Sequence, residues 1–550
     1  MRPILPKSLL GYLLAALPMG LAAAQTASSA PAGNNAGSFR VAGTIVSKTD
    51  AHPLGRARVT LREASNPEKY ESIITGDDGR FAFENVPAGK YSLTGAKRGF
   101  IAASYDQHDQ FSTAIVTGSG LDTEALVLKL APNAVITGRV LDEAGDPVRH
   151  ATVMLYYDDH QEGVDQIRMR NGAQTDDLGS YEMPNLMPGT YFLSVRANPW
   201  YAVHPPSESD PHRKAEITVD RSLDVAYPVT YYADATDSES ATPIPVKGGE
   251  RLQVDIHLNP VPALRLLFRV PGDTQHGFTF PRLEQPAFDS STFIQSGGGY
   301  QVSPGLFEIT GVPAGHYNVR LQGQGRNVQM NGIDLNKDGE QIDTTAAEEV
   351  SSLKISVQIP AENSIPKGFS VGLRSKGRNI AGFHSLDDKG ETQIDNVSAG
   401  RYDVLVWGVR KPYSIARMTA EGAEVSGHSI TLAPGASASA SLTLVAGSVE
   451  VDGIAKKAGR GFAGAMVVLV PRNPEGNRDL FRRDQSDQDG TFSLHNVVPG
   501  WYSLLAIENG WDLDWSQPAV IAAYAKHGRA IEVRDSGKAL NTEAIEVQSK

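Results

Sequence analysis

Residues 75–91, TGDDGRFAFENVPAGKY, carry a pattern that returns in residues 175–191 as TDDLGSYEMPNLMPGTY. Three more copies occur in residues 303–317, 388–402 and 487–502. Each copy has a leading glycine, and these glycines are Gly79, Gly179, Gly305, Gly390 and Gly490. Because the copies lie roughly 100 residues apart, they predict an array of small domains rather than a solenoid, whose units are shorter.

The first copy predicts two strands and the bend between them. Gly79 accepts the positive φ of an aspartate-rich turn. Phe81 and Phe83 alternate with polar neighbours, so both rings fall on one face of a strand that must be buried. Asn85 is interpreted as a turn-former. Tyr91 opens the return strand, where its hydroxyl can reach a backbone group, as at the tyrosine corners of sandwiches.

Each copy follows an opening strand, a turn and a second strand, and each unit closes with another alternating strand. About seven short strands in roughly 100 residues are typical of a Greek-key sandwich. We therefore expect an all-β protein, a tandem array of about five Ig-like or transthyretin-like β-sandwiches. The expected segments are a cleaved signal peptide (1–24), a flexible linker (25–38) and modules one to five (39–131, 132–260, 261–349, 350–447 and 448–550). The joints contain almost no spacer, which predicts a semi-rigid rod.

The N-terminus predicts export. Arg2 and Lys7 precede an apolar stretch at residues 9–21, and three alanines follow it. This stretch is too short for a membrane span and is interrupted by Pro18, so it is typical of a secretory signal. We expect a periplasmic, outer-surface or extracellular protein with no membrane span after signal removal. The absence of cysteine excludes a disulfide framework and an acyl anchor.

The charge balance argues against nucleic acid as a partner. The 550 residues carry a formal net charge of −12, and no basic run is present that could neutralise a phosphate backbone.

Two pairs of segments resemble a known family. GTIVSKTDAHPLGRARVTL (43–61) with residues 79–93, and GRVLDEAGDPVRHATVML (138–155) with residues 179–193, are similar to carboxypeptidase regulatory-like domains. This resemblance implies a transthyretin-like sandwich, also grouped with carbohydrate-binding-like folds. Two further stretches, 198–206 with 224–250 and 464–477, resemble multi-module exported bacterial proteins of the acidobacterial type.

The sequence does not support catalysis. None of the 13 histidines is followed by a glutamate three positions later, so the metal-binding pair of a zinc carboxypeptidase is missing. Residues 368–372, GFSVG, match the nucleophile-elbow pattern, but Phe369 and Val371 alternate through a strand and leave Ser370 within it. We expect a non-catalytic protein without a bound cofactor.

Two acidic turns are candidates for calcium. Asp334, Asn336 and Asp338 imitate the front half of an EF-hand loop, but Thr345 stands where that loop carries its bidentate glutamate. The other turn is DQSDQDG, residues 484–490. An ordinary hairpin turn is the alternative for both.

Two aromatic clusters are candidates for carbohydrate binding, because flat rings stack on sugar faces while polar side chains bind hydroxyl groups. They are Trp200, Tyr201, His204, Tyr231 and Tyr232 in module two, and Trp511, Asp512, Asp514 and Trp515 in module five. Packing between modules is the alternative, and Trp407 is expected in the core of module four. The leading hypothesis is binding of carbohydrate or a surface protein; a structural spacer and an accessory subunit of a hydrolase are the alternatives.

Overall fold

The computed structural model describes residues 38–205, 220–269, 281–294, 296–322, 327–344, 347–360, 365–375, 378–408, 413–447, 449–534 and 538–550. Nearly all regular structure in these segments is β-strand, with one α-helix, α1 (Pro518–Ala525). This confirms the all-β class. No helix in the described segments is long and apolar enough to cross a membrane. The expected signal peptide lies outside the described residues.

Module one folds into two sheets that share one core. Its strands are β1 (Phe39–Ser47), β2 (Arg58–Glu63), β3 (Tyr70–Ile74), β4 (Arg80–Val86), β5 (Gly89–Ala96), β6 (Ala103–Ser104), β7 (Ile115–Thr117) and β8 (Leu126–Leu130). The first sheet has the order β4-β1-β8, and the second has the order β3-β2-β5-β6 with β7 also beside β5. Val41 and Leu128 of the first sheet pack with Val59 and Leu93 of the second.

Module two repeats this plan. Its elements are β9 (Ala134–Leu141), β10 (Thr152–Asp159), β11 (Gln166–Gln174), β12 (Ser180–Leu186), β13 (Gly189–Arg196), the 3-10 helix η1 (Arg221–Leu223), β14 (Val225–Ala226), β15 (Thr230–Tyr231), β16 (Ile244–Val246), β17 (Arg251–Gln253) and β18 (Ile256–His257). The order β12-β9-β17 forms one sheet, with β18 also beside β9, and β11-β10-β13-β15 forms the other. The tip of the β10–β11 hairpin contacts module five, where His160 bonds the Leu513 carbonyl.

Module three also contains two sheets. Its strands are β19 (Val261–Pro262), β20 (Leu264–Arg269), β21 (Arg282–Ala287), β22 (Ser290–Phe293), β23 (Gly298–Ser303), β24 (Leu306–Val312), β25 (Gly315–Gln322), β26 (Asn327–Leu335), β27 (Glu340–Asp343) and β28 (Glu348–Glu349). The sheets have the orders β23-β24-β20-β27 and β22-β21-β25-β26-β28. The short β19 pairs instead with β14 of module two.

Module four contains a four-stranded and a five-stranded sheet. Its strands are β29 (Ser351–Gln358), β30 (Ser370–Ser375), β31 (Arg378–Ser385), β32 (Glu391–Val397), β33 (Gly400–Trp407), β34 (Tyr413–Glu421), β35 (Glu424–Ser426), β36 (Ser429–Leu432) and β37 (Ser437–Ala446). The sheets have the orders β32-β29-β37-β34 and β31-β30-β33-β36-β35. Ser370 lies in β30, so the expectation that it is a strand residue is confirmed.

Module five departs from the plan, because its last strand joins the two layers. Its elements are β38 (Val449–Lys457), β39 (Arg460–Gly461), β40 (Met466–Pro471), η4 (Arg478–Leu480), β41 (Arg482–Gln485), β42 (Thr491–Val497), β43 (Gly500–Glu508), η5 (Gly510–Asp512), α1, β44 (Arg529–Val533), β45 (Leu540–Asn541) and β46 (Ile545–Ser549). Strand β46 pairs with both β38 and β43. Every residue of β40 is buried, because α1 and the loop at 510–517 cover its outer face.

The recurring pattern is the bend expected from the sequence. The five leading glycines, Gly79, Gly179, Gly305, Gly390 and Gly490, have φ between 68° and 84°. Asn85, Asn185, Asn396 and Asn496 have φ between 58° and 62°, and Gly311 takes this place in module three with φ of 72°. Tyr91, Tyr191, Tyr317, Tyr402 and Tyr502 each donate a hydrogen bond to the carbonyl four residues earlier. The pattern is therefore scaffold.

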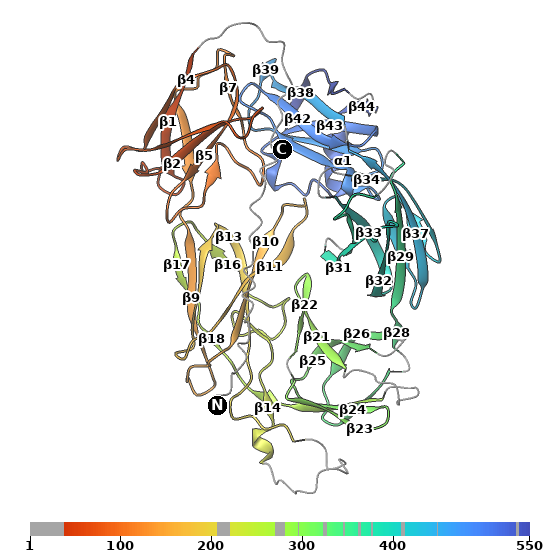
Figure 1. The fold of residues 1–550 in the computed structure, drawn as a ribbon. Coiled ribbons are helices and arrows are strands. Elements are labelled where there is room, and N and C mark those ends of the chain that lie inside the picture. The colour runs from red at the N-terminus through yellow and green to blue at the C-terminus, as the bar shows by residue number, and fades with distance from the viewer. Residues whose placement is uncertain are drawn as a thin grey trace, which may run out of the picture.

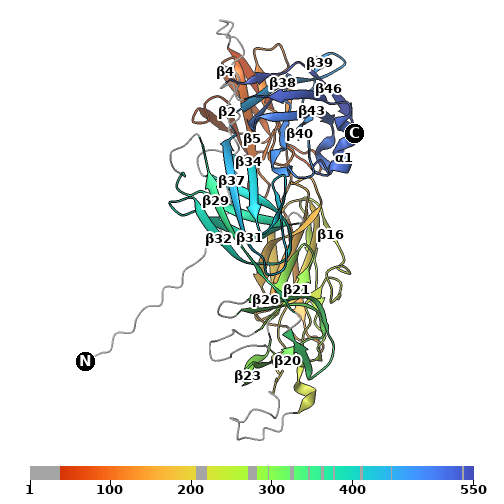
Figure 2. The same ribbon diagram turned by 90° about the vertical axis from the view of Figure 1, so that its right-hand side faces the viewer.

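The modules form a closed ring, so the expected rod is wrong. Figures 1 and 2 show module five returning to lie beside module one. Lys90 of module one donates to Asp487 of module five over 2.6 Å. The backbone amides of Ala114, just before the edge strand β7, and of Val116, within it, donate to the side chains of Asp487 and Gln488. The acidic turn at 484–490 thus covers the β7 edge of the module one sheet, whose backbone amides would otherwise lack hydrogen-bond partners within the protein.

Candidate functional site

The first aromatic cluster contains an exposed patch where the chain leaves β13. The Trp200 side chain is 87% exposed, and its ring meets that of Tyr201 edge to face, with centroids 5.8 Å apart. The Tyr201 hydroxyl donates to the carboxylate of Glu143, which lies in the turn after β9. Tyr227 donates to the other oxygen of that carboxylate over 2.9 Å. Trp200, Tyr201, Tyr227 and Glu143 are called the Trp200 patch below.

Hydrogen bonding fixes the ionisation of the Trp200 patch. Burial raises the pKa of Tyr201 to about 12, and the bond to Glu143 adds to this shift. Burial acts in the same direction on Glu143, but the hydrogen bonds from Tyr201, from its own backbone amide and from Tyr227 outweigh it and hold the pKa of that carboxyl below its ordinary value. The patch therefore presents an anionic acceptor beside an apolar ring at neutral pH.

The other predicted residues of this cluster lie in packing contacts. The Tyr231 ring is fully buried and meets Phe288 of module three edge to face. Tyr232 is half-buried against the core of module two. His204 bonds Asp224 through Nδ1 over 3.0 Å, and its ring lies directly against Gly297 of module three.

The second cluster lies where modules one, two and five meet. The Trp511 indole stacks on His108 of module one, with centroids 5.0 Å apart and planes 7° apart. The Arg483 guanidinium lies 4.2 Å from the centre of the Trp515 ring, and Gly163 of module two lies against that ring. These tryptophans therefore fill a junction between modules.

The two aspartates of this cluster are bonded within the same junction. Asp512 pairs with Lys550, and Asp514 accepts a hydrogen bond from Gln517 over 2.6 Å. The other Asp514 oxygen faces His160 of module two at 3.6 Å. His160 and its neighbour Asp165 lie outside the predicted set of site residues, because the contact of His160 with module five joins positions 353 residues apart.

Among the expected calcium residues, Asp334 lies near the end of β26, and Asn336 and Asp338 lie in the turn between β26 and β27. Asp338 accepts from the Arg265 backbone amide and from its Nε, each over 3.0 Å, and this hydrogen bonding lowers the pKa of the Asp338 carboxyl. Asp334 pairs with His316 at 2.8 Å, while Asn336 is exposed. Arg265 and His316 already bind these two carboxylates, and a calcium role for this turn stays a prediction.

Trp407 corrects one expectation, because it is 61% exposed rather than buried. Tyr402 and Val404 point into the core of module four. Since side chains alternate along a strand, Trp407 falls on the opposite face. Its ring lies beside that of the exposed Phe383, with centroids 6.3 Å apart.

The comparisons with known proteins agree with the sandwich fold. Residues 40–118 and 135–220 match the carboxypeptidase regulatory-like domain family, which confirms the resemblance of modules one and two. None of the curated proteins matches the chain.

Among solved structures, the chain is similar to the Bacillus anthracis TIE protein, with 11% identity, 74% of each chain covered and a TM-score of 0.17. It is similar to a streptococcal ancillary pilin, with 13% identity, 56% of this chain and 98% of that chain covered, and a TM-score of 0.20. It is also similar to GBS52, the minor pilin of Streptococcus agalactiae, with 12% identity, 41% and 97% covered, and a TM-score of 0.21. Likenesses of this strength carry no argument about function.

Proposed function

We propose that the chain is an exported, non-catalytic ring of five sandwiches that binds a carbohydrate through the Trp200 patch. Export is proposed from the signal-like residues 1–24, and it would place the ring in the periplasm, at the outer surface or outside the cell. The module boundaries near residues 131, 260, 349 and 447 belong to the same proposal, supported by five separate apolar cores.

The exposure of Trp200 is the observation that carries this proposal. An indole with 87% of its surface in water keeps a large apolar area unburied, and large aromatic surfaces favour contact with a flat apolar partner. The face of a pyranose ring, with its axial C–H groups, is such a partner.

The polar members of the patch suit a hydroxylated ligand. The Glu143 carboxylate has about four lone-pair positions, of which Tyr201 and Tyr227 occupy two. The remaining positions accept hydrogen bonds from sugar hydroxyls. The Tyr201 oxygen, whose own proton is committed to Glu143, accepts another.

Binding to immobilised polysaccharides tests the proposal. Wild-type protein should be retained on at least one neutral polysaccharide of a broad panel, and Trp200→Ala should weaken that retention at least tenfold. Trp407→Ala is the matched control, because it removes an exposed tryptophan of another module. Equal retention of wild type and Trp200→Ala, or loss only in Trp407→Ala, would contradict the assignment.

A structural spacer without a small-molecule ligand is the second candidate. The observation that favours it is the packing of Trp511 and Trp515 at the junction of modules, since these indole side chains stabilise the closed arrangement of the modules. Absence of retention on every member of the polysaccharide panel would favour this alternative.

A further inference from the structure

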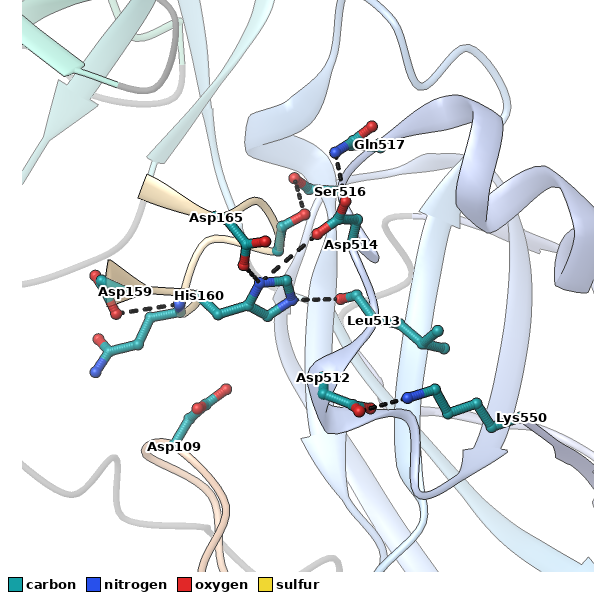
Figure 3. A network of polar contacts seen from close by, with 12 residues as sticks. Asp109, Asp159, His160, Asp165, Asp512, Leu513, Asp514, Ser516, Gln517 and Lys550 are labelled. Atoms are coloured by element: carbon teal, nitrogen blue, oxygen red, sulfur yellow. Dashed lines mark hydrogen bonds and ion pairs between the residues drawn. The ribbon is translucent and has the colours of Figure 1, made fainter. Parts of the chain in front are cut away.

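We propose that His160, Asp165 and Asp514 form a binding site for a divalent transition-metal ion, Zn²⁺ or Mn²⁺, that links module two to module five. Figure 3 shows the three side chains converging between the tip of the β10–β11 hairpin and the loop after η5. One ligand atom from each residue lies within 4.8 Å of the ligand atoms of the other two. Among the described residues, no other group of three histidine or acidic side chains has this geometry.

The orientation of the imidazole leaves one nitrogen for a cation. His160 Nε2 lies 2.7 Å from the carbonyl oxygen of Leu513, and a carbonyl only accepts, so Nε2 carries a proton. In the neutral ring the lone pair of Nδ1 then points toward Asp165, at 2.7 Å, and Asp514, at 3.6 Å. Backbone carbonyls orient metal-bound histidines in this way.

A metal ion satisfies all three groups at once, whereas a proton does not. A proton on Nδ1 would serve Asp165, but Asp514 lies beyond hydrogen-bond distance at 3.6 Å. In a tetrahedral site with bonds of about 2.0–2.2 Å, neighbouring ligand atoms lie about 3.4 Å apart. The 3.6 Å between His160 and Asp514 is close to this value, whereas the 2.7 Å between His160 and Asp165 must lengthen when a metal binds. The Asp165 side chain is 75% exposed, so it can shift to reach the ligand position.

The surroundings hold the ligands in place. Gln517 binds the second oxygen of Asp514 over 2.6 Å, which leaves the first oxygen for the metal. Ser516 donates to the Gly163 carbonyl over 3.1 Å, and Arg374 of module four pairs with Glu162 at 3.1 Å. The hairpin tip is therefore fixed before a metal binds, which lowers the entropic cost of binding.

The donor set selects the class of metal. One imidazole and two carboxylates suit Zn²⁺ or Mn²⁺, whereas Ca²⁺ takes six to eight oxygen ligands. The exposed side of Asp165 leaves room for water to complete the coordination. Because the ligands come from two modules, bound metal should also stabilise the ring.

Calorimetric titration of the tag-free, chelator-treated full chain tests the site. Wild type should bind one equivalent of Zn²⁺ or Mn²⁺ more tightly than Ca²⁺ or Mg²⁺. Asp165→Asn changes an exposed residue and should weaken binding at least tenfold, as should Asp514→Asn. Asp512→Asn removes a neighbouring carboxylate that pairs with Lys550 but leaves all three ligands in place, so it should retain most of the wild-type affinity.

Circular dichroism establishes that each variant is folded. Lack of Zn²⁺ and Mn²⁺ binding by wild type, tighter binding of Ca²⁺, or unchanged binding in Asp165→Asn would each overturn the site. If mild acid stabilises the contact between His160 and module five while metal does not, a proton occupies the position assigned to the metal. That result would also overturn the site.

Discussion

The Trp200 patch of module two and the loop at 510–517 of module five share a composition rich in aromatic and acidic residues but have opposite surroundings. Each combines tryptophan with neighbouring acidic or aromatic residues in a stretch outside the regular strands. Trp200 is exposed to water, whereas Trp511 is stacked on a histidine of module one. The difference shows that ring closure, and not local composition, decides which aromatic residues are free to meet a ligand.

The largest effect on stability is expected at the contact between modules one and five, where the ring of modules closes. Lys90→Met removes the cation from the buried Asp487, and breaking a buried pair in this way costs about 3 kcal/mol, at the lower end of the known range. Hydrogen exchange at the Ala114 and Val116 amides, which donate to module five, should accelerate by roughly a hundredfold.

Lys129→Met is the control for this prediction, because Lys129 is an exposed lysine of the same module. Small-angle X-ray scattering should show an expanded particle for Lys90→Met and an unchanged one for Lys129→Met. Equal exchange rates in the two variants would mean that the Lys90–Asp487 pair does not hold the ring closed.

The second-largest loss of stability is expected at Trp511, in the aromatic region that is packed at a junction between modules. Trp511→Ala removes a stacked ring and its contact with Phe111, at a cost of about 2 kcal/mol, below the range for a fully buried aromatic residue. Chemical denaturation should show this loss at the module one–module five junction. A loss below about 0.5 kcal/mol would mean that the stacking contributes little to closure.

A third effect concerns pH. Burial raises the pKa of Asp484 to about 7, and the nearby charge of Asp487 contributes. The folded state therefore holds this proton more tightly than the unfolded state, so stability is greatest below about pH 4 for this group and falls as pH rises toward 7. Urea unfolding at several pH values should show the decline, and Asp484→Asn should flatten it. An unchanged slope in that variant would exclude Asp484 as its source.

The repeated bends could be predicted from the sequence because their causes are local. Gly79 must be glycine, since a Cβ there would lie 2.7 Å from the Ile45 carbonyl oxygen, and Tyr91 bonds a carbonyl only four residues away. Such short-range constraints leave a visible pattern. The face occupied by Trp407 was also predictable, because counting by two from Tyr402 places it outside the core.

Ring closure could not be predicted in this way. Lys90 and Asp487 are separated by 397 positions, and nothing in either local pattern identifies the other. The same holds for His160 and Asp514, which belong to different modules. Glu143 lies in an ordinary turn, and only the return of Tyr201 and Tyr227 to that turn makes it part of a candidate site.

The smallest effect on stability is expected at Trp200. Because its side chain is largely in water, Trp200→Ala should change the free energy of unfolding by less than about 0.5 kcal/mol, in contrast to Trp511→Ala. The same substitution should abolish most polysaccharide retention, so stability and binding separate at this residue. Parallel denaturation curves of both variants measure the contrast. A loss near 2 kcal/mol in Trp200→Ala would show that this indole stabilises the fold and would remove the reason for assigning it to a ligand.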